Sequence, residues 1–513
     1  MKKYSGALII LFFLILHLVI INDYGLTWDY HFHFFGGGHL LGFSWQQLES
    51  RALPYVEPDP RNAWSLPYGP IMSVPPILSF LLLKNILPPD SAYNLLGILW
   101  GVLGIGILYV FMKQAFSSRV ALLSTLFLAL LPRYFGDMHN NMKDIPSAVI
   151  FAVNMWLLWR LAKFKRPIDL LWAVFAFAVA FNVKINSIFI PVIFFVWLLL
   201  QRSFSKLLSF YFLLAPLAAF GMWSLFWQHP ITQLWHAYRT FGIGTNNIEV
   251  LLNGSWYCSG SSVPWYYPFW YLAITTPLPI LFFFFIGLFT KHSPSKLLLL
   301  LWLFLPITRY LLPSVGVIDG VRHFEEVLFP IAAIAAIGMS QIKPIRLMNS
   351  LALLLSCYLL FTIFSYHPYQ ITYFNELVGG VKGAFGKYDL DYWGTSQKAA
   401  VEWVNIRAPQ NAKVHIVMAP DVAGTYLRPD LLTHLNKFEY DASDFVIILN
   451  RQSFYYRFFY AYDYLLTHAP IYTVSVKGTP LTWVFDNNHK TPRQAPWWQG
   501  EDPCIRNYWK GQE

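Results

Sequence analysis

Long apolar runs separated by short polar loops follow one another along residues 1–365 of the chain. In a helix, about 20 apolar residues cross the roughly 30 Å hydrocarbon core of a bilayer. The pattern therefore predicts a helical membrane protein with about eleven spans, at residues 6–22, 71–87, 93–112, 145–162, 170–183, 186–200, 207–225, 268–290, 296–312, 325–341 and 346–364.

The apolar segment 120–131 is too short for a span, because a helix of that length covers only about 18 Å. We predict a half-inserted helix on the outer side of the membrane. With the N-terminus in the cytoplasm, this topology puts the basic loops on the cytoplasmic side, as the positive-inside rule requires: Lys2, Lys3, Lys84, Lys163, Lys165, Arg166, Arg202, Lys206, Lys291, Lys296, Lys343 and Arg346.

The pattern changes at about residue 366, where alternating apolar and polar positions replace the long runs. Such alternation is typical of strands, and it occurs at residues 413–418, 444–449, 471–476 and 479–485. Helix-like stretches lie at 396–407 and 453–466. The sequence thus predicts a transmembrane domain over residues 1–365 and a small extracytoplasmic α/β domain over residues 366–513.

Composition supports a bilayer as the surroundings of the chain. Hydrophobic residues make up 56% and charged residues 12%, against about 25% charged in soluble proteins. The net charge is +10, but the basic residues sit in short loops between apolar runs, so nucleic acid is not an expected partner. There are three cysteines and no CxxC pair. Two of them, Cys258 and Cys504, fall outside the membrane and could form a disulfide there.

Polar residues gather in the outer loops, beginning with Asp29 directly after the first span. An acid at the membrane surface could take a proton from a hydroxyl acceptor. The alternative is a helix cap or a solvated loop acid. The spacing of the nearby histidines matches no common metal site: His31, His33 and His39.

A second cluster runs from Arg133 to Pro146. Asp144 and Pro146 suit the start of a helix, so an N-cap explains Asp144 equally well. Asp137 has no such structural explanation. Together with Lys143, it is a candidate to line a site.

Two cations are candidates to bind phosphate. Lys184 lies between two apolar runs, where a charge costs about 2.5–3.5 kcal/mol unless it finds a partner such as a lipid phosphate; snorkelling to the interface is the alternative. Arg322 has a forked donor suited to phosphate, and an ion pair with an aspartate or glutamate of the same loop is its alternative. Trp265, in the loop 226–267, could stack on a sugar or belong to an interfacial belt.

Taken together and in this order, these motifs resemble the GT-C glycosyltransferases related to protein O-mannosyltransferases, which include the aminoarabinose transferases of lipid A. The resemblance covers roughly residues 1–405. Its motifs are Asp29, Asp137, Lys184, Asp319-Gly320-Val321-Arg322-His323-Phe324, Pro264-Trp265-Tyr266-Tyr267-Pro268, Thr275-Thr276-Pro277-Leu278, His367-Pro368-Tyr369, Tyr373-Phe374-Asn375, Gly379-Gly380 and Asp391-Tyr392-Trp393-Gly394.

The resemblance implies a GT-C fold and transfer of a sugar from a polyprenyl-phosphate donor to a hydroxyl on the outer face. It makes Asp29 the base, although the family often has Asp-Glu where this chain has Asp29-Tyr30. Arg322 and Lys184 would neutralise the departing phosphate. No cofactor is expected, with a divalent metal as the alternative. Further residues would bind or orient substrates: Asp137, His323, Asp319, Lys143 and Trp265.

The sequence therefore predicts an inverting, polyprenyl-phosphate-dependent hexosyl- or pentosyltransferase of the inner membrane. Its N-terminus would be cytoplasmic and its C-terminal domain extracytoplasmic. The acceptor could be a protein, a lipid or a glycan. Two alternatives involve no covalent chemistry: a transporter or flippase of lipid-linked sugars, and a membrane protein that only binds glycolipid.

Overall fold

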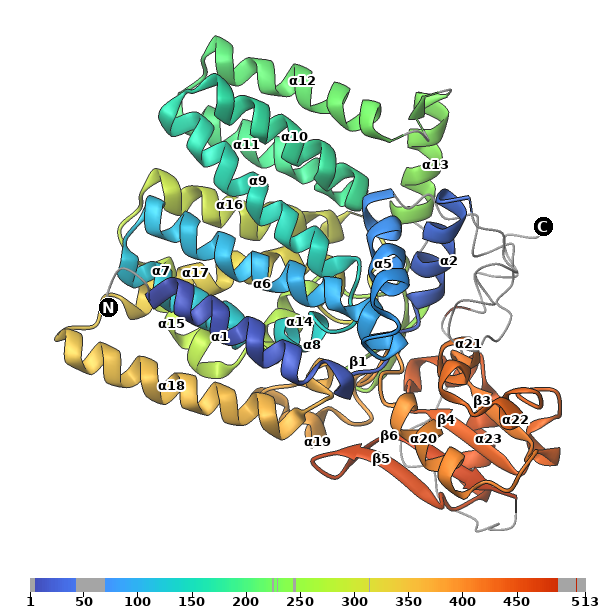
Figure 1. Cartoon of the computed structure of the whole chain (residues 1–513). Coiled ribbons are helices and arrows are strands. Elements are labelled where there is room, and N and C mark those ends of the chain that lie inside the picture. The colour runs from blue at the N-terminus through green and yellow to red at the C-terminus, as the bar shows by residue number, and fades with distance from the viewer. Residues whose placement is uncertain are drawn as a thin grey trace.

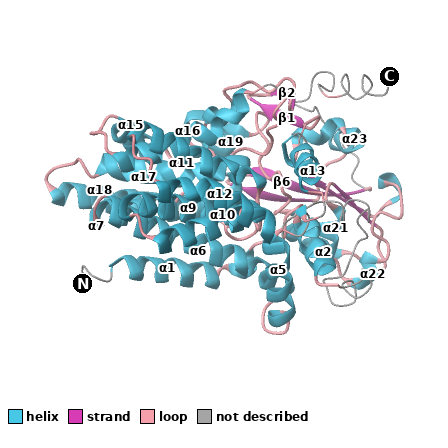
Figure 2. Cartoon of the chain, turned by 90° about the horizontal axis from the view of Figure 1, so that it is seen from above, coloured by secondary structure: helices cyan, strands magenta, loops and turns pink. Residues whose placement is uncertain are grey.

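The computed structural model describes residues 5–42, 70–223, 226–227, 229–242, 246–312, 314–487 and 504. Helices lie side by side in a bundle, and a small sheet with its own helices lies at one end of it (Figures 1 and 2). We call that end the sheet end and the other the far end, where α1 begins. The bundle contains α1 (Ser5–Val19), α6 (Pro89–Ala115), α7 (Ser118–Ala129), α9 (Asp144–Phe164), α10 (Pro167–Val183), α11 (Phe189–Gln201), α12 (Lys206–Met222), α15 (Leu278–Leu288), α16 (Pro294–Thr308), α17 (Leu328–Met339) and α18 (Ile345–Tyr366).

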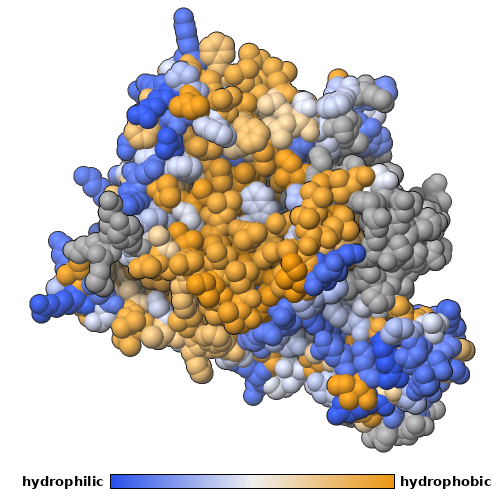
Figure 3. Space-filling view, viewed as in Figure 1, coloured by the Kyte–Doolittle hydropathy of each residue, from blue (hydrophilic) through white to orange (hydrophobic). Residues whose placement is uncertain are grey.

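The surface of the bundle is that of a multi-pass membrane protein. Within the described ranges, four helices are long and apolar enough to cross a bilayer, namely α6, α9, α18 and the segment Pro294–Leu311. Figure 3 shows a continuous hydrophobic face over the bundle and a hydrophilic surface on the sheet end. Large apolar side chains project from this face into the surroundings, as Leu11 and Ile15 do on α1, and Leu353 and Phe361 on α18.

The predicted span 71–87 is wrong. Its helix, α5 (Pro70–Leu83), lies across the sheet end of the bundle beside α2 (Tyr30–Leu40) (Figure 1). The rings of Phe34 and Phe80 are 5.1 Å apart, and the Ser79 hydroxyl donates to the carbonyl of Ala92 in α6 at 2.6 Å. Lys84 therefore lies at the sheet end. Ile77 and Phe80 of this 14-residue helix are buried, while Leu78 and Leu82 on its other side are exposed.

The prediction for residues 120–131 is also wrong, because α7 runs from the far end toward the sheet end. Its start follows Gln114, whose side chain accepts from the Trp156 indole in the far half of α9 at 3.1 Å. Its end leads into α8 (Pro132–Asp137), where the Tyr134 hydroxyl donates to the Gly101 carbonyl of α6 at 2.9 Å. Protein surrounds α7, since α6, α17, α1 and α18 pack on it, so the length rule for an isolated span does not apply.

These two errors cancel. Because α5 lies across the bundle and α7 lies along it, the basic loop that follows α9 is at the same end of the bundle as the start of α1 (Figure 1).

The predicted span 268–290 is broken into α14 (Tyr267–Thr275) and α15. Thr276 is extended (ψ 131°), as expected for a residue before proline, because the Pro277 ring disfavours the helical conformation there. The Asn375 side-chain amide donates to the carbonyls of Ala273 and Thr276 at 2.7 Å each. Those carbonyls are thereby satisfied at the break.

In the described part of the chain, the C-terminal sheet has four strands in the order β3-β4-β6-β5. The strands β3 (Val414–Val417), β4 (Phe445–Leu449), β5 (Tyr472–Val476) and β6 (Thr479–Asp486) lie where alternation predicted them. Only β3 and β4 pair in parallel. The predicted helices correspond to α20 (Gln397–Arg407) and α23 (Phe459–Thr467). Apolar side chains cover both sheet faces, because Ile447 of β4 joins the core with α20 and Ile448 joins the core with α23.

The segment 226–267 forms α13 (Pro230–Gly242) and a hairpin of β1 (Glu249–Leu252) and β2 (Ser255–Cys258). The predicted disulfide is confirmed, since Cys258 and Cys504 are bonded with a Cα–Cα distance of 5.1 Å. An ion pair of 2.6 Å between Glu249 and Arg457 adds a second link to the C-terminal domain. Short helices complete the fold, namely α19 (Gly380–Ala384), α21 (Pro420–Ala423) and α22 (Pro429–Leu432).

Candidate active site

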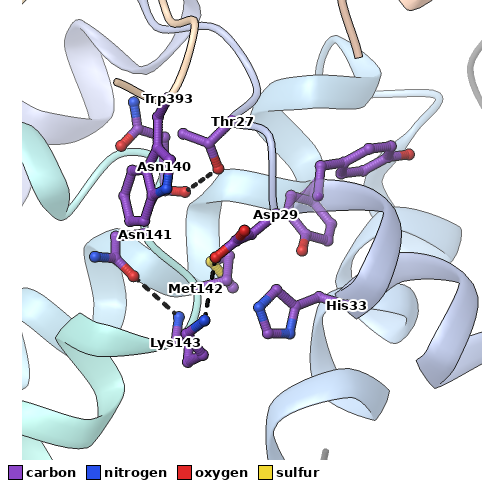
Figure 4. Close-up of a pocket in the computed structure, with 10 residues that line it drawn as sticks. Thr27, Asp29, His33, Asn140, Asn141, Met142, Lys143 and Trp393 are labelled. Carbon is purple, nitrogen blue, oxygen red and sulfur yellow. Dashed lines mark hydrogen bonds and ion pairs between the residues drawn. The ribbon is translucent and has the colours of Figure 1, made fainter. Parts of the chain in front are cut away.

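A small pocket lies at the sheet end, with about 10 Å³ open to the centre of a water molecule. It is built where α1 turns into α2, where α8 leads into α9, and where the chain passes from α18 to the C-terminal sheet. Figure 4 shows the Asp29 carboxylate pointing into it, with Lys143 on one side and His33 on the other. The lining residues are Thr27, Asp29, Tyr30, His33, Tyr93, Asn140, Asn141, Met142, Lys143 and Trp393.

Asp29, the predicted base, is an ion-paired carboxylate. Its Oδ2 lies 3.1 Å from Lys143 Nζ and 3.4 Å from Arg322 Nη2. Burial opposes ionisation of this carboxyl, but the two cations outweigh it and hold the pKa of Asp29 below its ordinary value. In the ligand-free site Asp29 is therefore charged and only weakly basic.

Arg322 is the centre of the charged groups. Besides Asp29, it contacts Asp319 (Nη1–Oδ2, 3.1 Å) and Asp144 (Nε–Oδ2, 3.5 Å). Its guanidinium lies over the Trp393 ring, 4.7 Å from the ring centre. The pair with Asp319 is one that the sequence left open as the alternative to phosphate binding, and the ligand-free structure contains it.

Lys184 is not a snorkelling lysine, because its Nζ donates to Asp144 Oδ1 at 2.7 Å. Asp144 in turn is not the N-cap of α9. The Asn141 side-chain oxygen accepts the amide of Asp144 at 2.7 Å and that of Lys143 at 3.2 Å. The Asp144 carboxylate is left to face the two cations Lys184 and Arg322.

These contacts join into one set, which we call the Arg322 network. It runs from Lys143 through Asp29 to Arg322, continues through Asp144 to Lys184, and branches through Asp319 to a cation of the C-terminal domain. Its members are Lys143, Asp29, Arg322, Asp144, Lys184, Asp319 and Arg451.

Asp137 lies outside the pocket lining, at the end of α8, fully buried. Its carboxyl lies beside that of Glu325 and near Arg133, and neither carboxyl has another hydrogen-bond partner among the described residues. Two carboxyls can share a hydrogen bond only if one is protonated. Burial accordingly raises the pKa of Asp137 to about 6, although the contact with Glu325 and the charge of Arg133 act to lower it.

His323 lies beside the network without joining its ion pairs. Its backbone carbonyl accepts a hydrogen bond from Arg309, and its ring is near Arg322, Lys184 and Asp144. Its Nε2 is buried and makes no hydrogen bond to the described residues. A donor or acceptor group of a substrate could satisfy it.

Trp265 is a predicted site residue that the structure places far from the pocket lining. It is 65% exposed and contacts the rings of Tyr266 and Phe269, which fits the interfacial belt. Trp393 takes the aromatic position in the pocket. The motif that contains Trp393 was visible in the sequence. This chain is rich in aromatic residues, however, and the sequence does not indicate which tryptophan faces the site.

Sequence reasoning also missed Glu325 and Arg451. Glu325 was assigned to the start of a span, and only the position of Asp137 opposite it reveals the pair. Arg451 comes from the C-terminal domain, more than a hundred residues from its partner Asp319, with no local pattern to mark it. Tyr30, which stands where the family often has Glu, packs against Tyr93 with ring centres 4.8 Å apart.

Among the residues that the structure describes, no group of three or more His, Cys, Asp or Glu side chains is arranged to hold a metal ion. The side chains of His31 and His39, which the sequence raised as possible ligands, lie outside the described residues, as does the outer loop 43–69.

Comparisons with known proteins show that the chain has a helical GT-C fold. Residues 75–227 match the family described as Dolichyl-phosphate-mannose-protein mannosyltransferase. ArnT from Cupriavidus metallidurans in the apo state has a similar structure, with a TM-score of 0.54 and 12% identity over 93% of this chain and 97% of that one.

Two further solved structures have the same fold. The undecaprenyl-phosphate-bound form of the same ArnT gives a TM-score of 0.51 and 13% identity over 96% of this chain and 99% of that one. The Archaeoglobus fulgidus oligosaccharyltransferase in the apo form gives 0.53 and 10% identity, over 96% and 77%. No curated protein sequence matches the chain significantly. The predicted resemblance to the GT-C glycosyltransferases is confirmed.

Proposed function

We propose that the protein transfers a sugar from a polyprenyl-phosphate donor to a hydroxyl acceptor on the outer face of the membrane. One observation carries this proposal: a partly buried acid, Asp29, faces a pocket at the level of the helix ends and is paired there with the cations Lys143 and Arg322. A lipid phosphate at that depth would meet those cations. The similar ArnT has been solved bound to undecaprenyl phosphate, which supports this class of donor.

The reaction would be a single inverting displacement. The acceptor oxygen bonds to the anomeric carbon as the bond from that carbon to the phosphate oxygen breaks. The electron pair of the broken bond stays on the lipid phosphate, and the acceptor proton goes to Asp29. Arg322 and Lys143 stabilise the developing phosphate charge, as preorganised cations do in a site shielded from water, with Lys184 supporting them through Asp144.

Donor binding would also activate the base. In the ligand-free site Arg322 is paired with Asp29 at 3.4 Å. A phosphate that takes Arg322 as its partner removes one of the two cations that depress the pKa of Asp29. The carboxylate then becomes more basic at the moment when the donor is in place.

The aromatic rings of Tyr30, Tyr93 and Trp393 line the pocket, and such rings could stack on a sugar. In the ligand-free structure only about 10 Å³ is open to the centre of a water molecule, so the pocket has to widen to admit a sugar ring. The cations of the Arg322 network would supply the positive charge that a metal supplies elsewhere. We therefore propose that transfer needs no cofactor and continues in the presence of EDTA.

We further propose that the protein lies in the inner membrane with the sheet end outside and the far end in the cytoplasm. Basic residues of the far end, such as Lys163, Arg166 and Lys206, support this orientation. About eleven crossings result, namely α1, α6, α7, α9, α10, α11, α12, α14 with α15, α16, α17 and α18.

The test is sugar transfer by purified protein from undecaprenyl-phosphate mannose and, separately, undecaprenyl-phosphate aminoarabinose, with a membrane extract as acceptor. Free undecaprenyl phosphate is measured by mass spectrometry. Asp29→Asn should lose about 100- to 10,000-fold in turnover, as expected for a general base, whereas Asp23→Asn, an exposed acid paired with His367, should keep normal turnover. Near-normal release by Asp29→Asn refutes the base assignment. Movement of intact donor across the membrane without release identifies a flippase.

A further inference from the structure

Arg451 belongs to the C-terminal domain but reaches into the Arg322 network. It follows β4 and is buried, with 4% of its surface exposed. Its Nη2 donates to Asp319 Oδ1 at 2.8 Å, and its Nη1 donates to the carbonyl of Tyr392 at 2.8 Å. The guanidinium thus bridges two segments, the loop before α17 and the segment that leads to α20.

Both segments hold Arg322. The carboxylate of Asp319 gives Oδ1 to Arg451 and Oδ2 to Arg322. Tyr392 is followed by Trp393, whose ring lies against the Arg322 guanidinium. One side chain therefore supports the ionic partner of Arg322 and the aromatic partner of Arg322 at once.

Arg451 is itself fixed from the C-terminal side. Its guanidinium lies 3.7 Å from the centre of the Phe454 ring and 5.4 Å from that of Trp28, the neighbour of Asp29. Arginine suits such a position because its planar fork can donate in two directions while its faces stack on aromatic rings. Lysine has neither property.

The loop that carries Asp319 needs such a support. Asp319 and Gly320 both adopt positive φ, 56° and 68°, a conformation that is uncommon for residues other than glycine, although aspartate takes it more readily than most. The amide of Gly320 donates to the Tyr267 hydroxyl at 2.9 Å. Arg451 and Tyr267 thus hold this unusual turn from two sides, and Arg322 follows directly.

We propose that Arg451 is a positioning residue that aims Arg322 at the phosphate of the donor, so that the C-terminal domain completes the active site. This inference rests on the proposed function. Without Arg451, both oxygens of Asp319 become available to Arg322, and a bidentate pair forms. Arg322 then turns toward Asp319 and away from the pocket and Asp29.

The first experiment measures binding of undecaprenyl phosphate and turnover in Arg451→Gln and Arg451→Lys. We expect donor-phosphate affinity to fall about tenfold or more in Arg451→Gln, the effect of one coupled contact in a network. Arg451→Lys should recover part of it, since lysine keeps the charge but reaches only one acceptor. The control is Arg457→Gln, which also lies over Phe454 but pairs with Glu249 outside the site; its affinity should stay within about twofold of wild type.

A second arm repeats Arg451→Gln in an Asp319→Asn background. If Arg451 acts through Asp319, the second substitution should add less than about a twofold further loss. The same tenfold loss in both backgrounds overturns the proposal, as does unchanged affinity in Arg451→Gln. Thermal unfolding of each variant shows whether the fold is retained. If Arg451→Gln does not fold, the same measurements are made on Arg451→Lys.

A structure of Arg451→Gln by electron cryomicroscopy separates this inference from the proposed function. We expect Arg322 to leave the face of Trp393 and to contact both oxygens of Asp319. If Arg322 keeps its position, the positioning role is wrong whatever the activity. If wild-type protein neither binds undecaprenyl phosphate nor transfers sugar, the proposed function fails, while the displacement of Arg322 is still decided.

Discussion

The buried pair of Asp137 and Glu325 makes stability depend on pH in a direction opposite to that of ordinary ion-paired acids. The pair lies where α8 ends, with no cation in an ion pair with either carboxyl among the described residues. The substitution Asp137→Asn keeps the shape of the side chain and supplies a permanent hydrogen-bond donor. The new amide therefore resembles the protonated form of Asp137, which burial favours, while Glu325, whose pKa the contact raises further, keeps its own proton.

The magnitude follows from the pKa of Asp137, which burial raises from 3.8 to about 6. The folded protein keeps a proton that the unfolded chain releases at about pH 4, so stability is lost as pH rises from about 4 to about 6. A shift of roughly two units corresponds to about 3 kcal/mol. Asp137→Asn should remove most of this loss, so the variant should be at least as stable as wild type at pH 7.5.

The assay is thermal unfolding of both proteins in detergent between pH 4.5 and 8. Asp169→Asn is the matched control, because Asp169 is equally buried but pairs with Arg160 at 2.9 Å. Its loss should destabilise the protein across the whole range, by the cost of an unpaired buried charge. If Asp137→Asn is less stable than wild type at pH 7.5 and keeps the same pH slope, the two carboxyls do not share a proton.

Three further predictions follow from single contacts. Arg322→Ala should weaken undecaprenyl phosphate binding about 10- to 150-fold, the effect of one charge-assisted contact; equal affinity by titration calorimetry contradicts the phosphate contact. Lys84→Cys should react with an impermeant maleimide from outside the cell, and Ser117→Cys only from the cytoplasm; the reverse pattern excludes the topology in which α7 crosses and α5 does not. Cys258→Ser should lower the free energy of unfolding by about 2–4 kcal/mol, and a non-reducing peptide map of wild type that finds two free thiols contradicts the disulfide.

Most of the fold could be predicted because apolar runs and basic loops constrain membrane topology strongly. The strands of the C-terminal domain were equally visible in their alternation. The two errors, at α5 and α7, have one cause. Length decides whether a helix spans only when lipid surrounds it, and the sequence does not say which apolar runs are covered by protein. Packing of α5 on α2, and of α7 between α6 and α17, decides both cases.

The charged residues of the site could be predicted from the sequence. Asp29, Lys143, Arg322 and Lys184 are costly at the membrane surface unless they are paired, so their positions in the sequence carry information. Aromatic residues do not carry the same information, because they are common throughout this chain. Trp265 was therefore chosen in place of Trp393.

The formal charge of the Arg322 network balances the charge of the bound phosphate at each stage of the proposed reaction. Counted over the described residues, the network holds four cations and three carboxylates, so its formal charge is one positive unit. A sugar joined to a lipid through one phosphate is a phosphodiester with one negative charge, and the bound donor makes the site neutral. After transfer, the lipid phosphate is a monoester with about 1.5 to 2 negative charges at pH 7.

The proton that Asp29 takes from the acceptor restores neutrality, since it raises the charge of the network by one unit. Asp29→Asn carries the charge of the protonated acid in every state. It should therefore bind undecaprenyl phosphate more tightly than wild type, even though its turnover is lost. A unit charge at about 4 Å contributes about 4 kcal/mol at an effective dielectric constant of about 20, so a gain of about tenfold is well within reach after hydration is included. Titration calorimetry that finds equal or weaker binding in Asp29→Asn would show that the charge of the network does not set its affinity for phosphate.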